Sequence, residues 1–483
     1  MRKNLLALSI AAMVGGLSGA ANAAVIATGT ANGLAINPQG VGHILTVPYF
    51  STQGNNKTLL SITNTDTTNG KAVKLRFRGA ANSDDIFDIT VYLSPGDVWT
   101  ADVAADGDIS RLATSDTSCT LPSAQDIKDL GGKFKTNRVQ GAAAAQTREG
   151  YVEILNTADI APGTGVAGAN SALYTAIKHV NGKAPCTAAV MDAQATELAN
   201  AADAATRGYA HPTGQLMANW ILVNVDGMAS HSGEAVAVRA VNAAGANAAG
   251  NIVWFPQTTD APTAGAVNTL TADPLLQSAG FAAEVANYDF PDLSTPYLAA
   301  PAAGAPETQA VTLANQLAVR SVVNEYATSN GFSTDWVFSM PTRRYAVALN
   351  YAAPAETRLL FNAGNTTHFN TVNTSLNAAG TLACVTPGVM RGFDREETTQ
   401  NSFVISPDTA MKLCGETSVL AFNNTGASVL GGLLARNNIT TRGADGWLSI
   451  NTANGGAGLP IIGFSALKAN GANLGGTWKH RAN

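Results

Sequence analysis

Residue types that usually carry out catalysis are sparse in this chain and do not form recognised motifs. The six histidines are not spaced as metal-ligand pairs, and neither HExxH nor a G-x-S-x-G nucleophile elbow occurs. Ser230-His231-Ser232 places two hydroxyls beside an imidazole. We interpret it as an exposed hairpin loop, because a nucleophile also needs an orienting acid and an oxyanion site. We therefore predict no catalytic residues and expect that the protein is not an enzyme.

An acidic loop is the best metal candidate in the sequence. Asp102, Asp106 and Asp108 surround Gly107, and carboxylate oxygens are ligands that calcium prefers. Because the spacing is not that of an EF-hand, we favour a solvated acidic loop. A weak calcium site at these three aspartates is the alternative, and we expect no other cofactor.

Two further groups of residues could bind a ligand, although a structural role is favoured for both. Residues 391–397 carry two arginines and three acidic residues, which we interpret as a mixed-charge surface. The tryptophans could stack on sugar rings, but most lie in apolar segments, where aromatic side chains usually pack in the core. The six tryptophans are Trp99, Trp220, Trp254, Trp336, Trp447 and Trp478.

The first 23 residues have the pattern of a secretory signal peptide. Arg2 and Lys3 form a basic segment, Leu5–Leu17 is a short apolar stretch, and residues 21–23 are a small-residue cleavage site. The apolar stretch is too short to anchor the protein in a bilayer. We therefore expect an exported mature protein that begins near Ala24, with no membrane span after cleavage.

The composition disfavours nucleic-acid partners. Charged residues make up 13% of the chain, against about 25% in a typical soluble protein. Removal of Arg2 and Lys3 with the signal peptide changes the net charge from -5 to -7. Nucleic-acid binding needs clustered basic residues, which a mildly acidic chain lacks. Weak charge repulsion instead permits self-association, so we expect a homo-oligomer or an array.

The four cysteines favour disulfide bonds, because their number is even and the chain carries an export signal. Four cysteines allow three pairings, and no CxxC spacing suggests redox or zinc chemistry. Each half of the chain contains two of them, so Cys119–Cys186 and Cys384–Cys414 is the simplest arrangement.

Short strands dominate the region from His43 to Val103. Val73, Leu75 and Phe77 alternate with basic residues, as in a strand with one solvent-exposed face, and 87–93 shows the same period. Turn residues such as those of Ser94–Asp97 separate the strands every eight to twelve residues. The pattern predicts a mainly β fold with helical insertions, specifically an immunoglobulin-like β-sandwich elaborated by Ala-rich helices.

Helical segments interrupt the strand pattern and suggest the domain organisation. Ala188–Arg207 and Glu307–Tyr326 are predicted helices, and Ser278–Tyr288 is a weaker case. Residues 291–306 contain four prolines among alanines and form the best linker candidate. We therefore predict an N-terminal β-sandwich region over 24–290 and a C-terminal α+β region over 307–483. One continuous domain is the alternative.

Several strand and turn motifs resemble those of a group of secreted proteobacterial proteins described as cell-surface or surface-layer-like. The resemblance reaches both ends of the mature chain but rests on structural residues, so it implies no catalytic residue. It implies a surface structural protein, the subunit of a two-dimensional array. The motifs are His43–Phe50, Thr58–Thr65, Leu93–Thr100, Thr334–Val337 with Pro341-Thr342, and Gly458–Phe464.

Three functions remain open from the sequence. The first is an exported, self-assembling structural protein of the S-layer type, on the surface of a Gram-negative bacterium and in contact with surface polysaccharide. The second is an extracellular adhesin or ligand-binding module, which would need a concave aromatic-lined pocket. The third is a secreted hydrolase, which would need carboxylates, or serine and histidine, brought together by the fold.

Overall fold

The computed structural model describes most of the chain. It covers residues 24–26, 29–136, 139–163, 170–196, 198–254, 292–294, 297–298, 306–351, 353–407, 410–423, 428–469 and 474–482. The predicted signal peptide (1–23), the predicted helix at 278–288 and most of the predicted linker (291–306) lie outside these residues. In the described part, no helix combines the length and apolar character that a membrane crossing requires.

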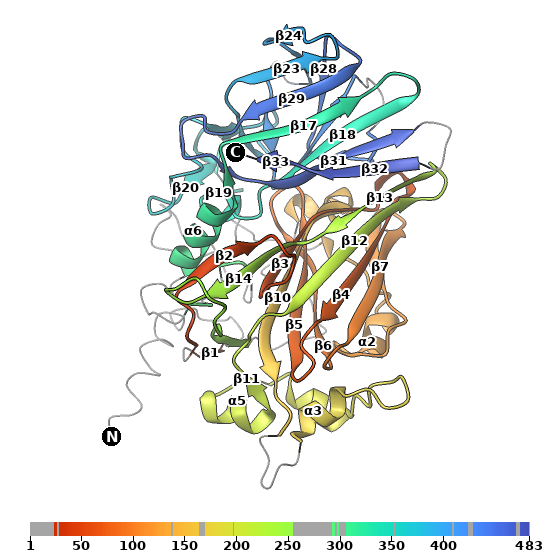
Figure 1. Cartoon of the computed structure of the whole chain (residues 1–483), viewed down its shortest axis with the longest axis vertical. Helices are drawn as coiled ribbons and strands as arrows, with labels where there is room; N and C mark the ends of the chain where they lie inside the picture. The colour runs from red at the N-terminus through yellow and green to blue at the C-terminus, as the bar shows by residue number, and fades with distance from the viewer. Residues whose placement is uncertain are drawn as a thin grey trace.

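Two antiparallel sheets build the N-terminal half (Figure 1). The larger, eight-stranded sheet has the order β2 (Gly33–Asn37), β14 (Val236–Val241), β3 (Ile44–Ser51), β10 (Glu149–Ile160), β5 (Gly70–Gly79), β6 (Asp85–Leu93) and β9 (Cys119–Leu121), with β11 (Tyr209–Ala210) paired to β10. The five-stranded sheet has the order β13 (Ala229–Glu234), β12 (Leu216–Asn224), β4 (Lys57–Asn64), β7 (Val98–Asp106) and β8 (Ile109–Ala113).

These two sheets bury alternate residues in one hydrophobic core. Leu75 and Phe77 of β5 meet Leu60, Ile62 and Trp99 from β4 and β7, and all of these are at least 97% buried. The predicted mainly β fold is therefore confirmed. Both sheets are larger than those of a constant-type immunoglobulin domain, and the finer immunoglobulin-like prediction is not confirmed.

The predicted solvent-exposed face of β5 is wrong, because its basic residues are buried. Lys74, Arg76 and Arg78 are 3% exposed or less. The Arg76 guanidinium lies 2.7 Å from the Asp85 carboxylate, and that of Arg78 lies 3.2 Å from Glu153. Carboxylates thus replace the water that the alternating pattern predicted, as buried charges require.

The C-terminal half is a second pair of sheets. One has the order β24 (Thr399–Gln400), β23 (Met390–Asp394), β29 (Asp445–Asn451), β17 (Ser321–Ala327) and β33 (Arg481–Ala482). The other has the order β25 (Val404–Ser406), β28 (Arg436–Thr440), β27 (Thr417–Phe422), β18 (Phe332–Ser339), β31 (Ile462–Ala469) and β32 (Leu474–Lys479). Trp336, Phe338 and Phe422 belong to the core between them.

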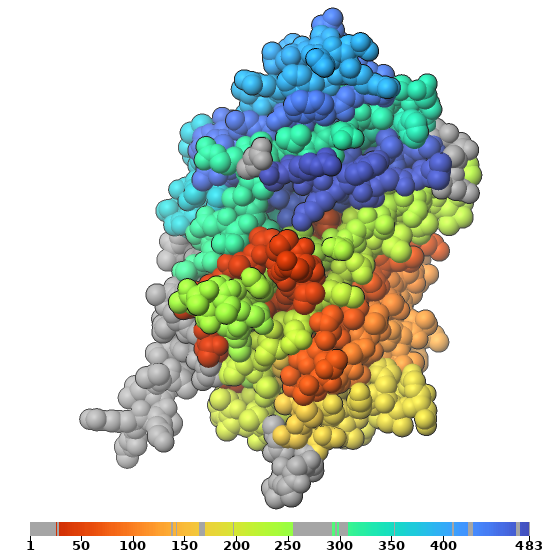
Figure 2. Space-filling view, viewed as in Figure 1, coloured from red at the N-terminus to blue at the C-terminus, as the bar shows by residue number. Residues whose placement is uncertain are grey.

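The two halves pack directly on one another, as the blue and the red-to-green strands show in Figure 2. The six-stranded sheet also contributes to the N-terminal core through the face that points away from the C-terminal core. The residues on that face are Val337, Val419 and Phe464. Glu149 accepts hydrogen bonds from the backbone N–H groups of Leu433 (3.0 Å) and Leu434 (2.6 Å). Burial raises the pKa of Glu149, and these hydrogen bonds oppose the rise.

Smaller elements surround the two sandwiches. Three minor sheets pair β1 (Ala24–Ile26) with β15 (Ile252–Trp254), β16 (Ala318–Val319) with β30 (Leu459–Pro460), and β19 (Val347–Leu349) with β20 (Leu359–Phe361). A fourth joins β21 (Thr374–Leu376), β22 (Ala383–Val385) and β26 (Leu413–Cys414). Short 3-10 helices are η1 (Gln53–Asn55), η3 (Gln140–Ala142), η4 (Ala144–Thr147), η6 (Arg343–Tyr345) and η7 (Ala355–Thr357).

The helices are shorter than predicted. They are α2 (Ala124–Asp129), α3 (Ala172–Ile177), α4 (Ala188–Ala193), α5 (Ala201–Arg207) and α6 (Pro306–Leu317). The predicted helix at 188–207 is two helices, because the Asn200 side chain accepts from two backbone N–H groups and starts α5 anew. The predicted helix at 307–326 ends at Leu317, after which β-branched valines continue as β17 and pair with β29.

Arg343 and Glu416 form a fully buried ion pair, 3.1 Å apart. Removing one partner measures how much the stability of the fold depends on charge compensation. We predict that Arg343→Met lowers the free energy of unfolding by about 3 kcal/mol, since it removes the strongest attraction on a buried carboxylate. The Arg343→Met/Glu416→Leu double variant should recover most of the loss. Denaturant unfolding measures both.

The matched control is Arg391→Met on β23, where the arginine is exposed. Its stability should change by less than about 0.5 kcal/mol. If Arg343→Met behaved like this control, buried charge compensation would not be a stabilising requirement.

Candidate functional site

The predicted disulfide pairing is confirmed. Cys119 on β9 is bonded to Cys186, 67 residues away, and Cys384 on β22 to Cys414 on β26, 30 residues away. On the chain-entropy model these bonds stabilise the fold by roughly 4.4 and 3.6 kcal/mol. Such bonds persist in oxidising compartments, which agrees with export.

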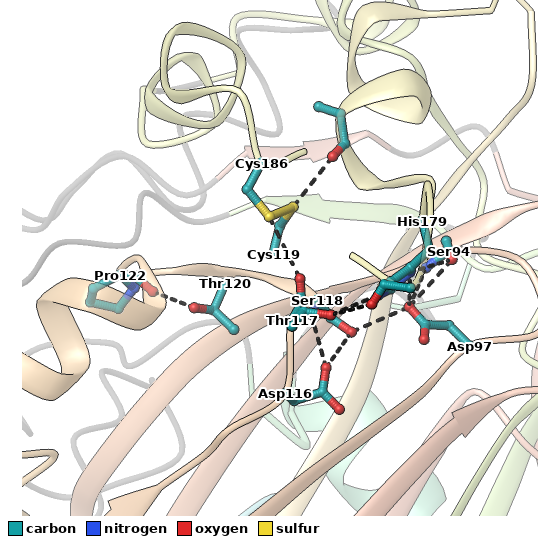
Figure 3. The surroundings of a disulfide bond; sticks show 12 residues. Ser94, Asp97, Asp116, Thr117, Ser118, Cys119, Thr120, Pro122, His179 and Cys186 are labelled. Carbon is teal, nitrogen blue, oxygen red and sulfur yellow. Dashed lines mark hydrogen bonds and ion pairs between the residues drawn. A yellow bond between two sulfur atoms is a disulfide. The ribbon is translucent and has the colours of Figure 1, made fainter. Parts of the chain in front are cut away.

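A polar cluster beside the first disulfide brings serine, histidine and an acid together (Figure 3). His179 Nδ1 lies 3.2 Å from Ser94 Oγ and 3.5 Å from Asp97 Oδ2. Both partners face the same ring nitrogen, whereas a catalytic triad needs the acid and the nucleophile on opposite nitrogens. Thr117 Oγ, 3.4 Å from Nε2, donates to the Gly182 carbonyl (3.1 Å). The cluster therefore joins loops and is not arranged as a triad.

The structure spreads the three predicted calcium ligands along a strand and its turn. Asp102 and Asp106 both belong to β7, so their Cα atoms are roughly 13 Å apart at the rise of an extended strand. Asp106 lies 3.4 Å from Lys133, and Asp108 is exposed in the turn. Within the described ranges, no three His, Cys, Asp or Glu side chains are grouped closely enough to hold a metal ion. Calcium binding by these three aspartates stays a prediction.

The interpretation of Ser230-His231-Ser232 as an exposed loop is wrong. These residues lie in β13, and their side chains alternate, with the serines exposed and His231 buried. His231 Nδ1 lies 3.2 Å from the Gly476 carbonyl of β32, so β13 approaches the C-terminal half here. Burial lowers the pKa of His231, and the imidazole is part of the contact between the halves.

Two of the six tryptophans line one groove in the C-terminal half. Trp99, Trp220, Trp254 and Trp336 are buried, as expected for core residues. Trp447 on β29 and Trp478 on β32 are 39% and 42% exposed, and both line a groove of about 600 Å³ together with Phe332. Its lining residues come from β17, β18, β23, β29, β31, β32 and β33 and the loops beside them; Figure 1 labels these strands.

The groove exists because β17 is only partly paired along one edge. The partner strand β33 covers only Val322 and Val323. Beyond them, the Glu325 carbonyl accepts from Trp336 Nε1 (3.0 Å) and Ser465 Oγ (3.3 Å), and Thr334 Oγ bonds both backbone groups of Ala327. Side chains of the other sheet thus satisfy this edge without a strand, which leaves the space above it open.

Both exposed tryptophans have defined supports. Trp447 stacks on Phe393 with ring centroids 4.3 Å apart and planes 13° apart. The Trp478 ring lies over Gly476, where an added Cβ would come within 2.6 Å of the ring. A glycine at 476 therefore leaves the room that the ring occupies. Fixed aromatic rings lose little conformational freedom when a ligand binds them.

The groove is lined by acidic and basic residues, and one of them, Asp445, already makes hydrogen bonds and an ion pair. Asp445 accepts from the backbone N–H groups of Thr328 (3.0 Å) and Ser329 (3.1 Å) and lies 3.6 Å from Arg395. Burial acts to raise the pKa of Asp445, but the Ser329 and Thr328 hydrogen bonds and Arg395 outweigh it and lower that pKa. Glu325, Asp394 and Arg481 complete the charged lining.

A half-buried histidine, His480, lies between β32 and β33. The His480 ring packs between Trp336 and Phe338, with centroids 5.3 and 5.1 Å away. Nε2 donates to the Val337 carbonyl (2.8 Å), and Nδ1 accepts from the Asn324 amide (3.1 Å). This arrangement fits the neutral imidazole only, because a proton on Nδ1 would face the amide hydrogens. Burial lowers the pKa of His480 to about 4.

The outer face of the five-stranded sheet in the N-terminal half (β13, β12, β4, β7 and β8) is a second open surface. Leu59 and Ile221 are direct cross-strand partners, 37% and 40% exposed, and Val98 on the same face is 46% exposed. Serine and threonine occupy neighbouring positions at Ser61 and Thr100. Alternation places these residues opposite the core, so a flat surface of low charge faces outward.

No protein-family model, curated protein or solved structure matches this chain. The function must therefore be inferred from its own surfaces. The sequence drew attention to the tryptophans and to residues 391–397, but only the fold places Asp394 and Arg395 in one groove with Trp447 and Trp478. His179 and His480 carried no local signal, because their partners are far away in the sequence.

His480 makes stability depend on pH. Its folded-state pKa of about 4 is below its ordinary value of 6.5, so the unfolded chain binds the proton first as pH falls. We predict that its contribution is complete above pH 6.5 and is lost towards pH 4, at a cost of about 3 kcal/mol. Denaturant unfolding of wild type and His480→Gln at several pH values isolates this contribution as a difference. Parallel stability curves for the two proteins would contradict the prediction.

Proposed function

We propose that this protein is an exported structural protein of the Gram-negative cell surface that assembles with itself as an S-layer-type subunit. The observation that carries the proposal is the open outer face of the five-stranded sheet. Export is supported by the signal-peptide pattern and by two disulfides. The immunoglobulin-like character of the β-sandwich and the location at the cell surface are parts of the same proposal.

The outer face suits a second copy of the chain. Its centre is aliphatic, at Leu59 and Ile221, and its charged residues are of both signs, with Lys57 near Asp102. A surface that carries both signs can complement itself, and its low charge does not oppose association. Removing the two aliphatic side chains from water supplies the driving force.

A second function, extracellular ligand binding, is favoured by one specific observation. The groove with Trp447 and Trp478 is the concave aromatic-lined site that such a module requires. Its volume of about 600 Å³ is typical of ligand sites, which span about 300–1,000 Å³. An assembling surface subunit can carry such a groove, so the two functions are compatible.

The assembly proposal predicts the effect of charge on the outer face. Leu59→Lys/Ile221→Lys places two like charges on directly opposed positions of adjacent strands and should weaken self-association at least about tenfold. Sedimentation velocity over a range of protein concentrations measures the change. Thermal unfolding of the variant shows whether the fold is intact.

Val225→Lys is the matched control, because Val225 is 74% exposed in the turn between β12 and β13, away from the centre of this face. It should associate like wild type. Equal association of all three proteins would place the assembly contact elsewhere, and a monomeric wild type at high concentration would refute the proposed function.

A further inference from the structure

We propose that the groove bounded by Trp447 and Trp478 binds a neutral polysaccharide chain. This inference deepens the second proposed function and rests on it. The self-assembly proposal is independent of it, because the five-stranded sheet of the N-terminal half (β13, β12, β4, β7 and β8) contributes no residue to the groove.

The aromatic residues supply the first argument. Of the six tryptophans, only these two are substantially exposed, and both line the same groove from strands of different sheets. Phe332, 37% exposed, lines it as well. Sugar rings have apolar C–H faces, and flat aromatic rings that are already fixed in place match those faces.

The charges supply the second argument and select a neutral ligand. Three carboxylates (Glu325, Asp394 and Asp445) and two guanidiniums (Arg395 and Arg481) line the groove, so their charges nearly cancel. Asp445 is engaged by Arg395 and by Ser329. A polyanion would meet the carboxylates and a polycation the arginines, whereas hydroxyl groups can donate to the former and accept from the latter.

The shape supplies the third argument. The groove follows the edge of β17, whose backbone groups are satisfied by Trp336, Ser465 and Thr334. A peptide strand would find those groups already occupied, so adding a strand to this edge is disfavoured. An extended chain that binds through its ring faces and hydroxyls needs no such backbone partners.

The test is binding of defined glycans to the mature, disulfide-bonded protein. The probes are neutral hexasaccharides of β-1,4-glucose, α-1,4-glucose, β-1,4-xylose and α-1,6-mannose, with heparin as the polyanionic comparison. Isothermal titration calorimetry gives affinity, and tryptophan fluorescence reports whether exposed indoles are covered. We expect at least one neutral glycan to bind, and Trp447→Ala and Trp478→Ala each to weaken it about tenfold or more.

Trp478→Phe should retain part of the binding, because it keeps an aromatic face, and thermal unfolding verifies that each variant is folded. Leu474→Ala on the same strand is the control, since Leu474 is 64% exposed but does not line the groove. It should bind like wild type. Binding of heparin alone, of no probe, or of a glycan equally by wild type and both alanine variants would overturn the proposal.

Assembly provides an independent readout. Trp447→Ala and Trp478→Ala should sediment like wild type, while Leu59→Lys/Ile221→Lys should bind the glycan normally. A wild type that binds a neutral glycan but stays monomeric would overturn only the assembly proposal, and a wild type that assembles but binds none of the glycans would overturn only the polysaccharide proposal.

Discussion

Charge burial within each half, and at the contact between the halves, is the constraint on which the rest of the structure depends. Arg78 and Glu153 lie 3.2 Å apart inside the molecule, and Arg343 and Glu416 form a second, fully buried pair. Removing a single partner from such a pair leaves an uncompensated charge, which costs more than the pair contributes. The first pair ties the register of β5 against β10, and the second ties the position of η6 within the C-terminal half. Asp292 joins the two halves, because its carboxylate lies 2.5 Å from Arg344 and 3.9 Å from Arg78.

A rigid arrangement of the halves also explains the two surfaces that we connect with function. The central strands β18 and β27 of the six-stranded sheet pack on both faces, β31 pairs with β18, and β32, which carries Trp478, pairs with β31. The five-stranded sheet of the N-terminal half is covered on one face only, so its other face stays open. The same packing thus fixes the groove and leaves the outer face available for a second copy.

The sequence predicted the class of fold and the disulfides, but not the placement of polar groups. Alternation in β5 identified the strand correctly, since alternation depends on neighbours in the sequence. It could not show that Arg76 and Arg78 are buried, because Asp85 and Glu153, which neutralise them, come from other strands. The helix predicted at 307–326 is confirmed only as far as Leu317, since pairing of β17 with β29 outweighs the local helix preference beyond it.

The groove could not be predicted from the sequence for the same reason, because distant residues form it. The sequence does not distinguish the six tryptophans, and only the fold separates four core residues from the two that line the groove along β17. Cross-strand and cross-sheet contacts carry this information, and they join residues more than a hundred positions apart.

Negative-stain electron microscopy of the purified mature protein, with calcium and then with a chelator, tests the central claim of self-assembly most directly. Self-assembly predicts ordered sheets or filaments in calcium, and their loss in chelator would show that the assembly needs a divalent cation. Dispersed single particles under both conditions would contradict the account and would leave ligand binding in the groove as the main function.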